Sequence, residues 1–234
     1  MYLSRVPVNP LSPAFRRDYA DVHDMHRTLM ARFPEAPDGV PAREHQDLLW
    51  RLEGQGRELV MYVQSRDHPN WGSLPEGYLS GRALVRSLQP VLSAVTDKAE
   101  FSFRLTANPT RSVSPPYSGQ KRPRGVRRPI HDPELQVQWL VRQGERHGFA
   151  LLDSSADAPD VVALPRPPAV GYKKAPENSR GPDRLKITVA SVTFDGRLRV
   201  TDPEAFRAAL GNGIGRAKAY GCGLLSLAPA RRAG

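Results

Sequence analysis

The sequence predicts an α+β fold made of two tandem ferredoxin-like (RRM-like) domains joined by a proline- and arginine-rich linker. The first half of the chain places strands and helices in the order β-α-β-β-(weak α)-β, which is the plan of a ferredoxin-like unit and of the RRM fold. The order of elements in the second half fits the same plan, and the stretch between the halves is rich in turn-forming and basic residues. We expect domains at 1–110 and 132–234, with the linker at 111–131.

The first half begins with a short strand and an amphipathic helix. Residues 2–8 have the apolar content of a strand. A helix is predicted over 21–33, because its apolar residues recur at steps of three and four and form one stripe that a core can bury. Asp21 is the expected N-cap and Pro34 the stop signal. The stripe consists of Val22, Met25, Leu29 and Phe33.

A hairpin and a further strand complete the first predicted unit. Residues 46–53 and 58–64 are predicted to form two strands joined by a glycine-containing turn at 54–56. The pattern then weakens, so any second helix near 76–87 is short. Residues 100–105 alternate between apolar and polar side chains, which predicts the closing strand of the unit.

The predicted linker contains turn-forming residues and positive charge. Residues 108–128 hold four prolines, and five basic residues lie between Lys121 and Arg128. Turn chemistry and charge together favour a linker or a mobile arm over a packed element. A helix is predicted next at 133–147, followed by a short strand at 149–152.

The last part of the chain predicts a hairpin, a helix and a final strand. Residues 186–194 and 198–200 flank the dipeptide Asp195-Gly196, and such a dipeptide is favoured in tight hairpin turns. The remaining elements are a helix over 203–210 and a strand over 224–227.

The positive charge of the chain lies entirely in its second half. The formal net charge is +10, while residues 1–110 contain 13 basic and 13 acidic residues, so the excess belongs to 111–234. Such asymmetry indicates a polyanionic partner for the second half. The alternative is an arginine-rich composition that serves only to keep the protein in solution.

The composition also indicates where in the cell the protein works. The N-terminus lacks the apolar segment of a signal peptide, and no apolar run is long enough to span a membrane. The single cysteine, Cys222, excludes an internal disulfide framework and a zinc cluster built from several cysteines. We expect a cytoplasmic protein with no membrane association.

Residues 211–229 form the stretch with the most unusual composition. Five glycines fall within thirteen residues, with Arg216 and Lys218 among them. Exposed backbone N–H groups beside two cations suit a phosphate, although the spacing fits neither the P-loop nor the dinucleotide-binding motif. The alternative is structural, with Gly211 as the C-cap of the preceding helix followed by a tight turn.

The same stretch resembles the C-terminal signature of the CRISPR repeat-processing endoribonucleases, in particular the type I-E (CasE) branch that serves the Cascade complex. The similarity covers GIG-x-AK-x-x-GCGLLSLAP, with Arg216 where relatives have proline. Other similar stretches are spread over essentially the whole chain. They are Met1–Val6, Met25–His26, Phe103–Pro109 and Gln138–Leu140.

This resemblance implies two ferredoxin-like domains and metal-independent cleavage of the CRISPR repeat transcript at the 3′ base of its hairpin. The products would carry a 2′,3′-cyclic phosphate and a 5′-hydroxyl, and the enzyme would stay on the mature guide RNA. The implied partners are repeat hairpin RNA, mature guide RNA and the other Cascade subunits. No cofactor or metal is implied, and we expect a monomer when the protein is free.

The chemistry implied by the resemblance requires groups that move protons, and histidine does so near neutral pH. His26 follows Met25 in the first predicted helix, which is the position of the family's catalytic histidine. His23 lies three residues earlier on the same face, where relatives have a tyrosine, and Arg27 adjoins the pair. The alternatives are two histidines on an exposed helix face, or a metal-binding pair that lacks a third ligand.

Two basic groups are candidates for binding RNA. A loop with clustered cations would grip the stem of the hairpin, because A-form RNA is recognised largely through its backbone and shape. The glycine-rich stretch would hold phosphates near the scissile bond. The stem-binding candidates are Lys173, Lys174, Arg180 and Arg184, and the phosphate-binding candidates are Gly213, Gly215, Arg216, Lys218 and Gly221, with Arg27 beside the histidines.

Two other functions compete with RNA cleavage. An RNA-binding scaffold of the same fold would have lost cleavage, as the missing tyrosine suggests and the presence of His26 opposes. An unrelated RRM-type regulator would bind single strands through exposed aromatic residues and would leave the glycine-rich stretch unexplained.

Overall fold

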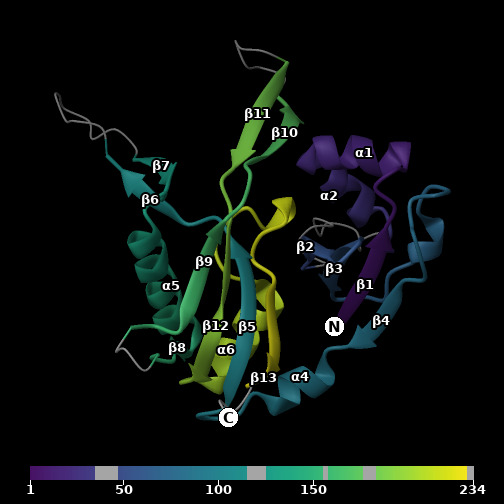
Figure 1. The fold of residues 1–234 in the computed structure, drawn as a ribbon. Helices are drawn as coiled ribbons and strands as arrows, with labels where there is room; N and C mark the ends of the chain where they lie inside the picture. The colour runs from purple at the N-terminus through teal and green to yellow at the C-terminus, as the bar shows by residue number, and fades with distance from the viewer. Residues whose placement is uncertain (35–46, 115–124, 155–157, 176–182, 231–234) are drawn as a thin grey trace.

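The computed structural model describes residues 1–34, 47–114, 125–154, 158–175 and 183–230. It confirms the α+β fold class: two antiparallel sheets lie side by side, each with its own helices and its own buried core (Figure 1). Both sheets have the strand order of a ferredoxin-like unit, so the tandem arrangement is confirmed as well.

The first unit has the sheet order β2-β3-β1-β4, with every neighbouring pair antiparallel. Its two helices follow the first strand, and their apolar residues share a core with the sheet. The elements are β1 (Tyr2–Val8), α1 (Pro13–Ala20), α2 (Val22–Met30), β2 (Leu49–Gln55), β3 (Glu58–Ser65), the short 3₁₀ helix η1 (Trp71–Ser73) and β4 (Leu84–Ser87).

The predicted long helix is shorter in the structure and is preceded by another. Helix α2 spans Val22–Met30, and Asp21 is its N-cap as predicted, accepting a hydrogen bond from the His23 backbone N–H at 2.9 Å. The preceding helix α1 was not predicted, although Pro13 at its first turn is a known start signal. Phe33 lies beyond the end of α2, where its ring packs edge-on against Trp71.

The strand that closes the first sheet was predicted wrongly. The fourth strand is β4, which pairs with β1 and falls within the stretch where a short helix was considered. The predicted strand near 100–105 is real, but it is β5 (Glu100–Ala107) and pairs with β12 and β13 of the second sheet. A weakly apolar four-residue strand such as β4 leaves little periodic signal, because most of its side chains are exposed.

The second unit has the order β13-β5-β12-β8, and β9 also pairs with β12. Helices α5 and α6 pack against this sheet around Trp139, Phe194 and Phe206. Besides β5, the elements are α4 (Gln89–Ala94), α5 (Pro133–His147), β8 (Phe149–Leu151), β9 (Val161–Pro165), β12 (Val192–Val200), α6 (Pro203–Asn212), the 3₁₀ helix η2 (Lys218–Tyr220) and β13 (Leu225–Pro229).

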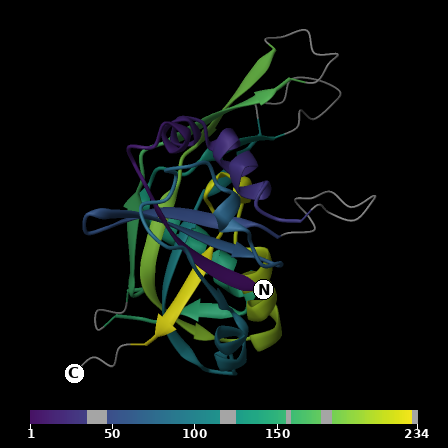
Figure 2. The same ribbon diagram turned by 90° about the vertical axis from the view of Figure 1, so that its right-hand side faces the viewer.

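Two hairpins extend from the second unit. One pairs β6 (Thr110–Val113) with β7 (Val126–Pro129), and all of it except Thr110 falls within the predicted linker. The other pairs β10 (Ala169–Lys174) with β11 (Arg184–Val189). The strands β10 and β11 project beside the purple helices α1 and α2 in both views (Figure 1, Figure 2).

The predicted hairpin turn at Asp195-Gly196 is wrong, because both residues lie inside the continuous strand β12. Gly196 pairs with Phe103 on one side and Val161 on the other. A Cβ atom at this position would lie 2.3 Å from the carbonyl oxygen of Asp160, so the glycine allows close strand packing instead of a turn.

Buried hydrogen bonds join the first sheet to the C-terminal segment. Their donors are side chains of β2 and β3, and their acceptors are backbone carbonyl oxygens around the glycine-rich stretch. Buried polar groups need such partners, so these bonds fix how the two units meet. The pairs are Trp50 Nε1 with Ala219 at 3.0 Å, Arg51 Nη1 with Leu224 at 2.9 Å, and Gln64 Nε2 with Leu210 at 2.7 Å.

Candidate functional site

Helix α2 is held in place at its N-terminus by the second unit. The Oδ1 atom of Asp21 accepts one hydrogen bond from His23 within the helix and another from the Tyr172 backbone N–H of β10, at 3.2 Å. Gly171 allows this approach, because a Cβ atom there would lie 3.0 Å from both the Asp21 carboxylate and the Val22 side chain. The two predicted catalytic histidines therefore lie where the units meet.

His23 and His26 flank the buried face of α2. Met25 and Leu29 are fully buried, whereas both histidines are half-buried, as the predicted stripe requires. The His23 ring lies 6.3 Å from the ring of Tyr220 in η2, with the planes inclined by 55°. The structure thus brings the histidine helix and the glycine-rich stretch together, although they are separated by almost the whole chain.

The glycine-rich stretch follows a path that only glycines adopt readily. Gly213, Gly215, Gly221 and Gly223 all have positive φ, between 75° and 92°. Two of them also lie against aromatic rings. A Cβ atom would be 3.2 Å from the Trp139 ring at Gly215, and 3.2 Å from the Trp50 ring at Gly221.

These glycines therefore have a packing role whatever else they do. The structural alternative named the wrong cap residue: α6 continues past Gly211 to Asn212, and Gly213 is the C-cap. Gly213 is buried against Leu49, while Arg216 is exposed and Lys218 is half-buried. Phosphate binding by the backbone of this stretch remains a prediction.

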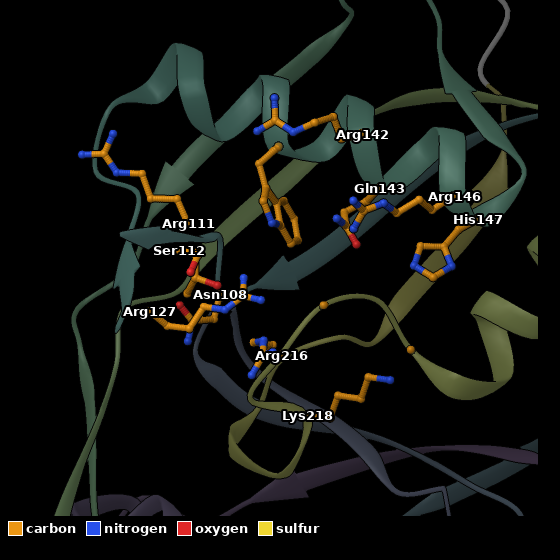
Figure 3. A pocket seen from close by; sticks show the side chains of 14 residues that line it. Asn108, Arg111, Ser112, Arg127, Arg142, Gln143, Arg146, His147, Arg216 and Lys218 are labelled. Carbon is orange, nitrogen blue, oxygen red and sulfur yellow. The ribbon is translucent and has the colours of Figure 1, made fainter. Parts of the chain in front are cut away.

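A strongly basic hollow of about 530 Å³ opens beside this stretch. Its lining comes from the hairpin β6–β7, one face of α5 and the glycine-rich stretch, which lie around a common space (Figure 3). Among the described residues that line it, none is acidic. Six cations surround the hollow: Arg111, Arg127, Arg142, Arg146, Arg216 and Lys218.

Sequence reasoning missed four of these six cations. Arg142 and Arg146 are four residues apart in a correctly predicted helix, so their shared face was available as a signal. Arg111 and Arg127 lie in the stretch that was treated as a linker, and only the pairing of β6 with β7 brings them to the hollow.

His147 also lines the basic hollow, at the end of α5. Partial burial lowers the pKa of this imidazole below its ordinary value, and the charges of Lys218 and Arg146 lower it further. Sequence reasoning gave His147 no role. Its position makes it a group that can gain charge next to a bound anion.

The hairpin β10–β11 carries the predicted stem-binding cations. Lys174 pairs with Arg184 and lies on the same face as Tyr172, while Lys173 lies on the other face. The Arg184 guanidinium stacks over the Tyr172 ring at 5.4 Å and reaches the Asp21 carboxylate at 3.6 Å. Arg184 therefore links the hairpin to α2. Arg180 lies outside the described residues.

The other groups considered from the sequence are the Cys222 thiol, Arg27 and a possible metal site. Burial raises the pKa of the Cys222 thiol to about 12, so the thiol is protonated at neutral pH. Arg27 is exposed on α2 and forms an ion pair with Asp24 at 3.3 Å. In the part of the chain that the structure describes, no three His, Cys, Asp or Glu side chains are grouped to hold a metal ion, and no helix is long and apolar enough to cross a membrane.

Comparisons with known proteins cover nearly the whole chain. The CRISPR-associated endoribonuclease Cse3 of Thermus thermophilus is 37% identical over 232 residues, which cover 98% of this chain and 100% of that protein. The Cascade subunit CasE of Escherichia coli K12 is 29% identical over 249 residues, with the same coverage of the two chains. A solved structure of Cse3 bound to a 19-nucleotide RNA is similar with a TM-score of 0.77, at 34% identity and over 98% of this chain and 100% of that one.

The family model described as CRISPR associated protein matches residues 1–229. The match includes both sheets, the histidine helix and the glycine-rich stretch, so it agrees with the resemblance found in the sequence. The chain belongs to this family of CRISPR-associated proteins.

Proposed function

We propose that this protein is an endoribonuclease that cleaves CRISPR precursor RNA at the 3′ base of the repeat hairpin. It does so without a metal ion, leaves a 2′,3′-cyclic phosphate and a 5′-hydroxyl, and stays on the mature guide RNA as a subunit of Cascade. The observation that carries this proposal is the meeting of the histidine helix with the glycine-rich stretch, in a chain that matches endoribonuclease Cse3 along its full length.

The names of the relatives support both parts of the proposal. Cse3 has been solved with an RNA that represents a pre-cleavage complex, at 33% identity and a TM-score of 0.73. CasE is named as a subunit of Cascade. A CRISPR RNA-guided surveillance complex contains a chain that is 25% identical to this one, with a TM-score of 0.67.

The reaction needs two proton transfers and stabilisation of negative charge. The 2′-oxygen attacks the adjacent phosphorus as its proton passes to a base, and the bond to the 5′-oxygen breaks as that oxygen receives a proton from an acid. We assign these two steps to His26 and His23, which share one side of α2. Each general acid or base of this kind typically contributes ~10²–10⁴-fold in rate.

Cations of the segment that contacts α2 would stabilise the doubly charged phosphorane. Lys218 begins η2, the same short helix that brings Tyr220 to His23, and Arg216 precedes it by two residues. Positive groups that are already in place when charge develops lower the barrier without reorganisation. Gly215 and Gly221, one on each side of these two cations, lie against the Trp139 and Trp50 rings, and this packing fixes the path of the segment.

RNA binding would extend over two basic surfaces. The basic hollow, with its six cations, would hold the phosphate backbone next to the cleavage site. The exposed side chains of Lys173 and Lys174 on the projecting hairpin suit a more distant contact with the stem. Arg184 would orient this hairpin through Asp21.

A non-cleaving RNA scaffold is the second candidate function. The observation in its favour is His23, which occupies the position of a tyrosine in the family pattern. Scaffold and enzyme make the same predictions for RNA binding, so cleavage separates them.

The test is to incubate the protein with a hairpin repeat RNA and to follow cleavage and retention of the product. We expect one cut at the 3′ base of the hairpin and a product that stays bound. His26→Ala should slow the cut by ~10²–10⁴-fold while leaving RNA affinity within a few-fold. His68→Ala, at an exposed histidine of the first unit, is the matched control. If the unaltered protein binds the RNA tightly but does not cut it, the non-cleaving scaffold is the function that the result supports.

A further inference from the structure

A second hollow, of about 310 Å³, lies between the two units and is lined in part by Tyr220, the residue that contacts His23. Its walls come from α1, α2, β2, η2 and the segment that leads from β9 to β10. Tyr220 lines this hollow and also contacts the ring of His23, so one side chain separates the hollow from the proposed cleavage site. Neither the sequence motifs nor the cleavage mechanism accounts for this space.

The walls of this hollow differ from those of the basic hollow. Its lining includes Tyr19, Met25, Trp50, Arg166, Ser191 and Tyr220. Arg166 is the single basic residue in its described lining. The one carboxylate, Asp18, is 1% exposed and accepts a hydrogen bond from the Tyr78 hydroxyl at 2.9 Å. An uncharged planar group therefore fits this space better than a phosphate.

Two tyrosines give the hollow the means to stack such a group. Tyr19, at the end of α1, is 64% exposed and lines the hollow, so its ring is accessible to a ligand there. Trp50 and Met25 supply an apolar floor, and the indole N–H of Trp50 is already bonded to the Ala219 carbonyl. Rings at the rim and an apolar floor are the features on which unpaired bases stack.

Polar groups at one wall can meet the edge of a base. The Nη2 atom of Arg166 donates to the Leu52 carbonyl oxygen at 2.9 Å, which holds the guanidinium at the wall. The Arg166 backbone N–H donates to the Ser191 carbonyl oxygen at 2.9 Å, so the two residues are tied together. Both residues line the hollow, and a guanidinium and a hydroxyl together provide donors and an acceptor.

We propose that this hollow binds the unstacked base of a nucleotide that flanks the scissile phosphate. The proposal rests on the proposed function, because it is the cleavage site at His23 that puts an RNA strand beside Tyr220. Stacking between Tyr19 and Tyr220 would pull this base out of the helical stack and fix the geometry of the neighbouring phosphate. Removing one stacking ring should weaken binding of such a base by roughly 5- to 100-fold.

The test uses repeat RNA with 2-aminopurine on either side of the scissile phosphate and a 2′-deoxy sugar that prevents cleavage. We expect fluorescence quenching on binding at one of the two positions. Tyr19→Ala should remove the quenching, and Leu11→Ala, at a 75% exposed side chain outside the hollow, should not. Unquenched fluorescence at both positions, or quenching that Tyr19→Ala leaves intact, would overturn the proposal.

An abasic nucleotide at the quenched position gives an independent measurement. It should weaken RNA binding by the unaltered protein. It should cause no further loss of affinity in Tyr19→Ala, because the base and the Tyr19 ring stabilise binding by stacking on each other. Equal losses in both proteins would contradict the proposal. These readouts need no cleavage, so a protein that quenches the base but never cuts cleavable RNA would contradict only the proposed function.

Discussion

At the residue scale, the surroundings of each titratable side chain decide what it can do. His23 lies against Tyr220, and its Nδ1 atom is buried with no hydrogen-bond partner among the described residues. His147 lies among cations in the basic hollow. Cys222 is buried, with 1% of its surface exposed. These three reactive side chains therefore have three different environments.

His147 should titrate below its ordinary pKa of ~6.5 in the free protein. Because the native pKa is lower than the unfolded value, its contribution to the free energy of unfolding is complete above pH ~6.5 and is lost as the pH falls through the native pKa. A phosphate bound in the hollow favours the charged imidazole, so RNA should raise this pKa. NMR titration of His147, assigned by His147→Gln, measures both values. A higher pKa in the free protein than in the complex would contradict the account.

Cys222 should be inert in the folded protein. Its pKa of about 12 leaves almost no thiolate at pH 8, and thiolate is the species that alkylating agents attack. Iodoacetamide should label the denatured chain within minutes and the folded chain far more slowly. Labelling at equal rates in both states would show that the thiol is not enclosed as the structure has it.

At the element scale, the glycine-rich stretch shows how packing restricts sequence. Each of its positive-φ glycines lacks room, suitable backbone geometry, or both, for a larger residue. The segment can therefore pass between Trp50 and Trp139 only with glycine at these positions. Its position beside α2 follows from this path and from the Trp50 hydrogen bond to Ala219.

Gly215→Ala and Gly221→Ala should each destabilise the protein by ~1–3 kcal/mol. The substituted residue would be held at positive φ, and its Cβ atom would crowd a tryptophan ring at 3.2 Å. Gly54→Ala is the matched control, because a Cβ atom there would meet nothing within 4 Å. Urea unfolding gives the three values. If Gly54→Ala lowers the free energy of unfolding as much as Gly221→Ala does, the effect is not specific to the glycine-rich stretch.

Elements whose apolar residues recur with a clear period were predictable from the sequence, and features that depend on which strands pair were not. The helix over 133–147 was predicted with its observed bounds, and the apolar stripe of α2 correctly separated its core from its histidines. Local patterns do not encode contacts between distant segments. Such contacts decide which strands pair with β5, and they keep β12 continuous through Asp195-Gly196.

The candidate site was predictable in part for the same reason. His23, His26 and Lys218 lie in stretches with a recognisable family pattern, and the structure brings those stretches together. Arg111 and Arg127 reach the basic hollow only through the pairing of β6 and β7. Tyr19 lies in α1, which was not predicted at all.

At the scale of the whole molecule, the two units contribute different parts of one surface. The first unit carries His23 and His26 and no net charge, while the second carries the excess positive charge and both projecting hairpins. Buried hydrogen bonds from β2 and β3 fix the two units against each other. A polyanion held by the second unit would therefore be presented to α2 in a defined position.

RNA affinity should depend strongly on salt, and the cations of the basic hollow should carry part of that dependence. Arg142→Gln and Arg146→Gln should each lower the slope of log Kd against log salt by about 1, because each would lose one phosphate contact. Arg57→Gln, in the turn between β2 and β3 of the neutral unit, is the control. Equal slopes for all three variants would place the RNA elsewhere.

The central claim is that the 2′-hydroxyl of the RNA performs the attack and that His26 assists it without a metal ion. The most direct measurement is cleavage of a hairpin repeat RNA in EDTA, beside a copy that has a 2′-deoxy sugar at the cleavage site. We predict one cut in EDTA that ends in a 2′,3′-cyclic phosphate, and no cut in the deoxy copy. A cut that requires added metal, or one that survives the 2′-deoxy substitution, would contradict the claim.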